Sequence, residues 1–74
     1  MNWQLLKNVN PPVDKLLLFY SPGGKAIFFA IRKDVQLEMA NTFTNGLRES
    51  WKCPYKWYKE MYGEKVYWTL LIKP

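Results

Sequence analysis

The chain has 74 residues, of which 49% are hydrophobic and 18% aromatic, a composition typical of a folded protein and not of a disordered one. This length predicts a single domain over residues 1–74, and a domain of that size buries only about 60% of its unfolded surface, which excludes a deep enclosed pocket. Eleven Lys and Arg residues against six Asp and Glu give a net charge of +5, which favours an acidic partner: nucleic acid, anionic lipid or an acidic protein patch.

The first half of the chain predicts a β-hairpin. Residues 8–14 contain two consecutive prolines and predict an extended connector. Residues 15–20 are apolar and are followed by Ser-Pro-Gly-Gly, a strong turn signal, so they predict a strand. Residues 25–32 predict its antiparallel partner. Alternate residues of this second strand form two faces, one with Ile27, Phe29 and Ile31 and the other with Ala26, Phe28 and Ala30.

The middle of the chain fits two kinds of element. Residues 34–39 alternate between polar and apolar, which is typical of a strand. Asp34 is also a suitable N-cap for a short helix that ends near Asn41, and Leu, Glu and Met are good helix formers. We favour the helix. The dipeptide Asn45-Gly46 then predicts a second turn.

The last third predicts a short helix and a strand. Residues 54–61 suit a helix, with Pro54 at its first position and Gly63 just beyond its end. Residues 65–73 alternate as a third strand. Together the elements predict an α+β fold, a small antiparallel sheet of three or more strands with one or two short helices. The two faces of the third strand are Val66, Trp68, Leu70 and Ile72 against Tyr67, Thr69 and Leu71.

The residues that most catalytic sites require are missing. The chain has no His, which removes the commonest general acid–base group and the usual partner of a Ser or Cys nucleophile. One Cys without His cannot build a structural zinc site. Residues 21–25 resemble a phosphate loop only superficially, because the required spacing and following helix are absent. We therefore expect a protein that is not an enzyme and that needs no cofactor or metal.

The compartment is predicted from cysteine usage and from apolar runs. The single Cys53 excludes an internal disulfide and indicates a reducing compartment. The longest apolar runs are far shorter than the about 20 residues that cross a bilayer, and the N-terminus lacks the segments of a signal peptide. The sequence predicts a cytoplasmic protein without membrane contact.

Aromatic residues are the main indication of binding. Four Trp, five Tyr and four Phe are more than so thin a core can bury, so most would pack on the sheet and the surplus would form a contact surface. Rings and charges mix most densely over residues 51–59. There Lys52, Lys56 and Lys59 have the spacing of one helix side, beside rings such as Trp57. Lysine stems that merely cover apolar surface are the simpler alternative.

A second group of cations is predicted at the ends of the hairpin. It consists of Lys15, Lys25, Arg32 and Lys33. Lysines at sheet edges also discourage the pairing of strands from different molecules, which explains part of this group without any partner.

Residues near both ends of the chain form an ordered set: Trp3, Pro12, residues 16–20, Gly23, Trp68, Leu71 and Pro74. This set resembles short phage and prophage proteins of uncharacterised function, which begin with a similar Trp and finish on a W-x-x-L-x-x-P-like strand. Tyr67 stands where those proteins commonly have His, and residues 34–62 depart from their pattern.

In its size, basicity and opening residues the whole chain also resembles small phage-encoded regulators that bind host bacterial RNA polymerase. The resemblance implies contact with the N-terminal region of the β′ subunit near the RNA exit channel, or with β. It further implies inhibition of initiation through σ-factor displacement, passage of polymerase through terminators, and a monomer acting in the infected cell.

We therefore expect a phage protein that regulates transcription through protein–protein contact. The alternatives are a module that binds single-stranded nucleic acid by lysines and ring stacking, or an inhibitor of another host protein. Nucleic acid is the secondary expectation. The residues expected to contact the partner are Lys15, Phe19, Tyr20, Lys25, Arg32, Lys33, Lys56, Trp57 and Lys59.

Overall fold

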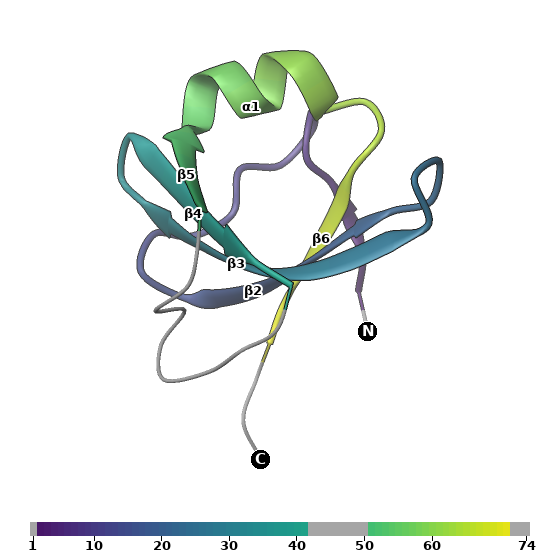
Figure 1. Cartoon of the computed structure of the whole chain (residues 1–74), viewed down its shortest axis with the longest axis horizontal. Coiled ribbons are helices and arrows are strands. Elements are labelled where there is room, and N and C mark those ends of the chain that lie inside the picture. Colours follow the sequence, from purple (N-terminus) through teal and green to yellow (C-terminus); the bar gives the residue numbers. More distant parts are fainter. Residues whose placement is uncertain (1, 42–50, 72–74) are drawn as a thin grey trace.

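The computed structural model describes residues 2–41 and 51–71, which form a six-stranded antiparallel sheet and one helix (Figure 1). The strand order across the sheet is β1-β6-β2-β3-β4-β5, and α1 lies between β5 and β6 in the chain. This arrangement confirms the predicted α+β fold. The elements are β1 (Gln4–Leu5), β2 (Leu16–Ser21), β3 (Ala26–Lys33), β4 (Gln36–Ala40), β5 (Trp51–Pro54), α1 (Tyr55–Tyr62) and β6 (Tyr67–Leu70).

The predicted hairpin is present as β2 and β3. Their register places Phe19 opposite Phe28 and Ser21 opposite Ala26. The backbone N–H of Lys25 donates a hydrogen bond of 3.2 Å to the Pro22 carbonyl and closes the turn. Strand β6 pairs with the other side of β2, so the hairpin forms the centre of the sheet.

The prediction of a helix over residues 34–41 is wrong, because Gln36–Ala40 forms strand β4 against β3. Asp34 has a φ of 53° and reverses the chain between β3 and β4, so it is a turn residue and not a helix cap. Leu37 and Met39 are buried while Glu38 between them is partly exposed. Burial with a period of two residues outweighs the helix propensities of these side chains.

The C-terminal prediction is confirmed with shifted boundaries. The helix covers Tyr55–Tyr62, with Pro54 as its extended N-cap instead of its first helical residue, and Gly63 follows it as expected. Residues 51–54, which were not predicted as a strand, form β5 against β4. The third predicted strand is β6. The last two residues of the predicted strand, 72 and 73, and the predicted Asn45-Gly46 turn lie outside the described residues.

The core lies between α1 and the inner face of the sheet. Figure 1 shows the sheet curving so that β5 and β6 lie on either side of α1. The Trp68 indole N–H donates a hydrogen bond of 2.9 Å to the Val9 carbonyl, which ties the connector to β6. The buried hydrophobic cluster consists of Leu6, Leu17, Phe19, Ala30, Leu37, Met39, Tyr55, Tyr58, Val66 and Trp68.

Replacing Gly63 by alanine is expected to destabilise the domain, because a Cβ there would clash with the Lys59 carbonyl oxygen and lie 3.4 Å from the Lys7 Cα. The φ of −57° is open to any residue, so the glycine is needed for space alone. We expect a loss of about 1–3 kcal/mol in the free energy of unfolding, measured by urea denaturation. The matched control is Gly23→Ala, where a Cβ meets nothing within 4 Å. Equal stabilities of the two variants would contradict this account.

Candidate functional site

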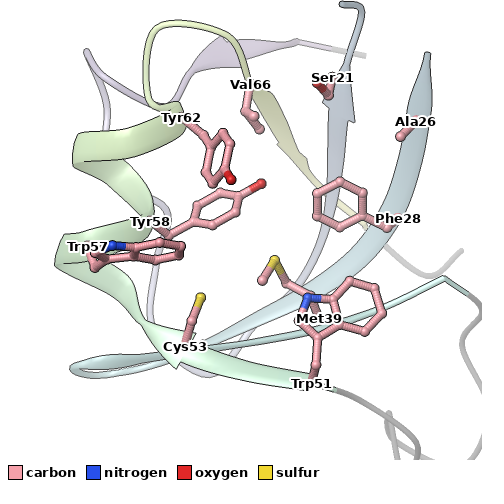
Figure 2. Close-up of a pocket in the computed structure, with 10 residues that line it drawn as sticks. All are labelled: Ser21, Ala26, Phe28, Met39, Trp51, Cys53, Trp57, Tyr58, Tyr62 and Val66. Atoms are coloured by element: carbon pink, nitrogen blue, oxygen red, sulfur yellow. The ribbon is translucent and has the colours of Figure 1, made fainter. Parts of the chain in front are cut away.

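An open groove of about 380 Å³ lies beside the core and is lined by residues of both α1 and the sheet (Figure 2). The helix contributes three aromatic side chains, Trp57, Tyr58 and Tyr62. Among the residues that the structure describes, none that lines the groove carries a formal charge, so the groove presents mainly aromatic and other apolar surface. We call it the aromatic groove. The sheet and the segment before β6 supply its other lining residues, Ser21, Ala26, Phe28, Met39, Trp51, Cys53 and Val66.

The rings of the aromatic groove form a continuous series that joins the helix to the sheet. Phe19, in the middle of this series, is fully buried beneath the groove. Ring contacts of this geometry hold each side chain in place, so the groove is formed before any ligand arrives. Successive ring centroids are 5.0 to 6.4 Å apart along the order Trp57, Tyr62, Tyr58, Phe19, Phe28 and Trp51.

The two tryptophans at the ends of this series are the most exposed aromatic side chains of the groove. Trp51 is 46% exposed and Trp57 is 47% exposed. Because half of each indole stays in contact with water, the free protein does not gain the hydrophobic stabilisation that full burial would give. Tryptophan and tyrosine in such positions dominate the energetics of protein interfaces. These two side chains therefore mark the face most suited to a partner.

Two phenol hydroxyls are among the polar groups of the groove. Figure 2 shows the hydroxyls of Tyr58 and Tyr62 pointing into it. Neither hydroxyl donates a hydrogen bond to another described residue, in contrast to Tyr55, whose hydroxyl donates to Asn10 Oδ1 at 2.7 Å. Burial raises the pKa of Tyr58 far above its usual range, so its hydroxyl stays protonated as a donor.

Cys53 lines the groove with a half-buried thiol, and burial raises its pKa. Because the thiolate is the reactive form, we expect alkylation by iodoacetamide to rise with pH through a higher midpoint than in the urea-unfolded chain. Mass spectrometry of samples quenched over a pH series measures both midpoints. Coinciding midpoints would contradict the buried position of this side chain.

The structure brings together only part of the predicted lysine stripe. Lys56 and Lys59 both lie on α1, next to Trp57. Lys52 lies on β5, so the prediction that all three lysines share a helix side is wrong, because the helix begins only after Pro54. Lys59 Nζ donates a hydrogen bond of 2.6 Å to Asn10 Oδ1. The lysines of α1 line a separate polar hollow with Lys7, Glu60 and Glu64.

The cations predicted at the hairpin ends do not form one cluster. Lys25 lies at the turn between β2 and β3, whereas Lys15 and Lys33 lie at the opposite end of the same hairpin. Lys33 is paired with Asp14 at 3.3 Å. Lys15 and Lys25 are exposed, so they remain candidates for partner contact, on separate parts of the surface.

Two neighbouring aromatic residues of β2, Phe19 and Tyr20, differ in their burial. Phe19 is fully buried in the core, because strand alternation directs it to the inner face, so the folded domain does not present this predicted contact residue at its surface. Tyr20 is partly exposed, and its ring lies 5.7 Å from that of Trp3. Tyr20 therefore lies outside the aromatic groove.

Arg32 is engaged by the protein's own backbone, which argues against its predicted contact with a partner. Its Nη1 donates to the Pro11 carbonyl at 3.0 Å and its Nε to the Asp34 carbonyl at 3.2 Å. The guanidinium also lies 4.1 Å from the centroid of the Tyr55 ring. One side chain thus joins the connector, the β3–β4 turn and the start of α1.

Replacing Arg32 by methionine keeps the apolar stem and removes both hydrogen bonds, leaving the carbonyl of the buried Pro11 without its donor. We expect the free energy of unfolding to fall by about 1.5–3 kcal/mol in urea denaturation. Lys15→Met, at an exposed position, is the control and should change stability by less than about 0.5 kcal/mol. A destabilisation no larger than that of the control would show that the two hydrogen bonds of Arg32 contribute nothing to stability.

Sequence reasoning missed most of the groove. Of the rings that line the groove, only Trp57 is among the residues predicted to contact a partner. Tyr58 and Tyr62 are four residues apart on one helix face, a spacing that could have paired them. Trp51 could not be placed without β5. Within residues 2–41 and 51–71 no group of His, Cys, Asp and Glu could hold a metal ion, and no helix could span a membrane.

Comparisons of the chain with known protein families, with curated proteins and with solved structures found no match in any of the three.

Proposed function

We propose that the chain is a non-enzymatic phage protein that binds bacterial RNA polymerase in the cytoplasm of the infected host, with the aromatic groove as its contact face. The observation that carries the proposal is the pair of half-exposed tryptophans, Trp51 and Trp57, over an uncharged hollow. A preformed apolar centre within a basic surface has the anatomy of a protein interface. Regulation by steric occlusion requires no catalytic group.

The partner itself is proposed on resemblance to small phage regulators. On that basis the contact is made with the N-terminal region of β′ near the RNA exit channel. Its consequences would be σ-factor displacement, inhibition of initiation and passage through terminators. The net charge of +5 supports an acidic patch on the polymerase as the complementary surface.

Single-stranded nucleic acid is the second candidate, because exposed rings next to lysines suit base stacking. Lys52 and Lys56 are adjacent in sequence to Trp51 and Trp57. However, no charged side chain of a described residue lines the aromatic groove, and Lys56 lines a different hollow on the helix. A strand of nucleic acid needs cations along its phosphates, so the groove favours a protein.

Capture of purified polymerase tests the proposal. The immobilised chain is incubated with core polymerase and with holoenzyme at low and moderate salt, and transcription is followed on a template with a σ-dependent promoter and a terminator. We expect retention of core polymerase with weak salt dependence, fewer promoter-initiated transcripts and more read-through. No retention at moderate salt would overturn the proposal. Steep loss with salt together with competition by single-stranded DNA would establish the second candidate instead.

A further inference from the structure

The aromatic groove continues into a second hollow. Ser21 and Tyr62 line both, and the second hollow has a volume of about 480 Å³. It lies against the turn between β2 and β3 and is also lined by Lys65 and Tyr67. We call these two adjoining hollows the channel: the tryptophans line the first hollow and the hairpin turn lines the second.

The two ends of the channel differ in chemistry. At the aromatic end, about 380 Å³ compares with the roughly 150 Å³ cavity that holds one benzene, so there is room for about two bulky apolar side chains. At the hairpin end, Lys65 makes no ion pair with a described residue. Glu64, which lines the same hollow, is already bound to Lys7 at 2.7 Å, and that hydrogen bond, with a smaller contribution from Lys65, lowers its pKa.

Lys25 is a second exposed cation beside the hairpin end, and it makes no ion pair with a described residue. It lines neither hollow itself, but it follows Gly24, which lines the second hollow, and precedes Ala26, which lines the aromatic groove. Its φ of 53° is in the left-handed region, which is unfavourable for a residue with a Cβ and is common at functional positions. The hairpin end therefore complements negative charge, while the aromatic end complements apolar side chains.

The hydroxyls of Tyr58 and Tyr62, which donate no hydrogen bond to another described residue, favour an extended occupant. An extended peptide leaves its backbone carbonyls free to accept hydrogen bonds, whereas a helix has already paired nearly all of them. Addition of a strand to the sheet edge is disfavoured, because the edge strand β5 has four residues and ends in Pro54, which has no N–H.

We propose that the channel binds an extended segment of the protein partner in one orientation, with two bulky apolar side chains between Trp51 and Trp57 and a run of acidic residues over the hairpin turn at Lys25 and Lys65. The inference rests on the proposed function only in taking the ligand to be a protein. The hydroxyls of Tyr58 and Tyr62 hold the backbone between these two ends.

A synthetic peptide with two tryptophans followed by four aspartates is the probe, with a nitroxide label at either end. NMR with wild-type protein should show the label at the aspartate end broadening the amide signals of Gly23 and Gly24. The label at the tryptophan end should broaden the indole signals of Trp51 and Trp57. Broadening that is independent of the labelled end, or reversed, overturns the proposed orientation.

Affinity for the same probe tests the chemistry of each end. Replacing the aspartates by lysines should weaken binding about tenfold, and replacing the tryptophans by serines should abolish it. The K25E/K65E double variant should lose the preference for aspartates and keep its fold by circular dichroism. A preference that this variant retains overturns the assignment of the hairpin end.

The peptide experiments and the capture of polymerase can fail independently of each other. If the peptide binds as described and polymerase is not retained, the channel stands and the polymerase assignment fails. If polymerase is retained by wild type and equally by Trp57→Ala, the polymerase assignment stands and the channel is overturned. Protection of β5 amides by the peptide would show strand addition and would also overturn the channel.

Discussion

Replacing Phe19 by alanine is expected to remove a large part of the free energy of unfolding of the domain. This ring is fully buried, and its centroid lies 5.7 Å from that of Phe28 and 6.0 Å from that of Tyr58. The substitution removes the central contact of the core and leaves a cavity, which costs about 3–5 kcal/mol. At about 0.05–0.15 kcal/mol per residue, a chain of this length has a total stability of only roughly 4–11 kcal/mol. Urea denaturation followed by circular dichroism measures the loss.

Two variants complete this experiment. Phe19→Leu retains an apolar side chain and should lose clearly less stability than Phe19→Ala. Ile27→Ala, on the same hairpin at a position 57% exposed, should change stability by less than about 0.5 kcal/mol. The original expectation that Phe19 contacts a partner makes the opposite prediction: a stably folded Phe19→Ala protein that has lost binding.

Replacing Trp57 by alanine is expected to weaken polymerase binding about 30-fold or more, which corresponds to about 2 kcal/mol, the loss typical of an interface hot spot. The free domain should keep its fold, because this indole is 47% exposed and belongs to no buried cluster. Titration of labelled protein with core polymerase measures the dissociation constant.

Trp3→Ala is the matched control for this substitution. Trp3 is also partly exposed, at 37%, and packs on Tyr20 away from the aromatic groove. The Trp3→Ala variant should bind with a dissociation constant within a factor of about three of wild type, because substitutions outside the few hot-spot positions change binding little. Equal losses for Trp3→Ala and Trp57→Ala would show that the groove is not the contact face.

The sequence was sufficient to predict the elements whose boundaries are marked by nearby residues. The turn over residues 21–24 separates two apolar strands, and the Pro54 and Gly63 boundaries frame α1, so hairpin and helix could both be predicted. Strand β5 could not be predicted in this way, because its residues alternate over only four positions. It becomes a strand only by pairing with β4 in the folded domain. Strand β4 differs from the predicted helix because the alternation of Leu37 and Met39, which places both in the core, outweighs their helix propensities.

The site was harder to predict than the fold for a physical reason. The aromatic groove joins Phe28, Trp51, Trp57 and Tyr62, which come from three elements and meet only when the sheet curves around α1. Exposure also depends on tertiary packing: the rings of Phe19 and Trp57 are equally apolar in the sequence, yet one is fully buried and the other half-exposed. Composition alone could indicate a surplus of rings but not which rings remain at the surface.

The place of β6 in the sheet determines when the domain can finish folding during translation. The hairpin and β4 can pair as soon as they leave the ribosome, since their contacts are local. Strand β6 is synthesised after every other described element, yet it lies between β1 and β2 and joins Gln4 to Trp68. A nascent chain that stops before Tyr67 therefore has an unpaired β1 and an open edge on β2, the kind of edge that invites aggregation.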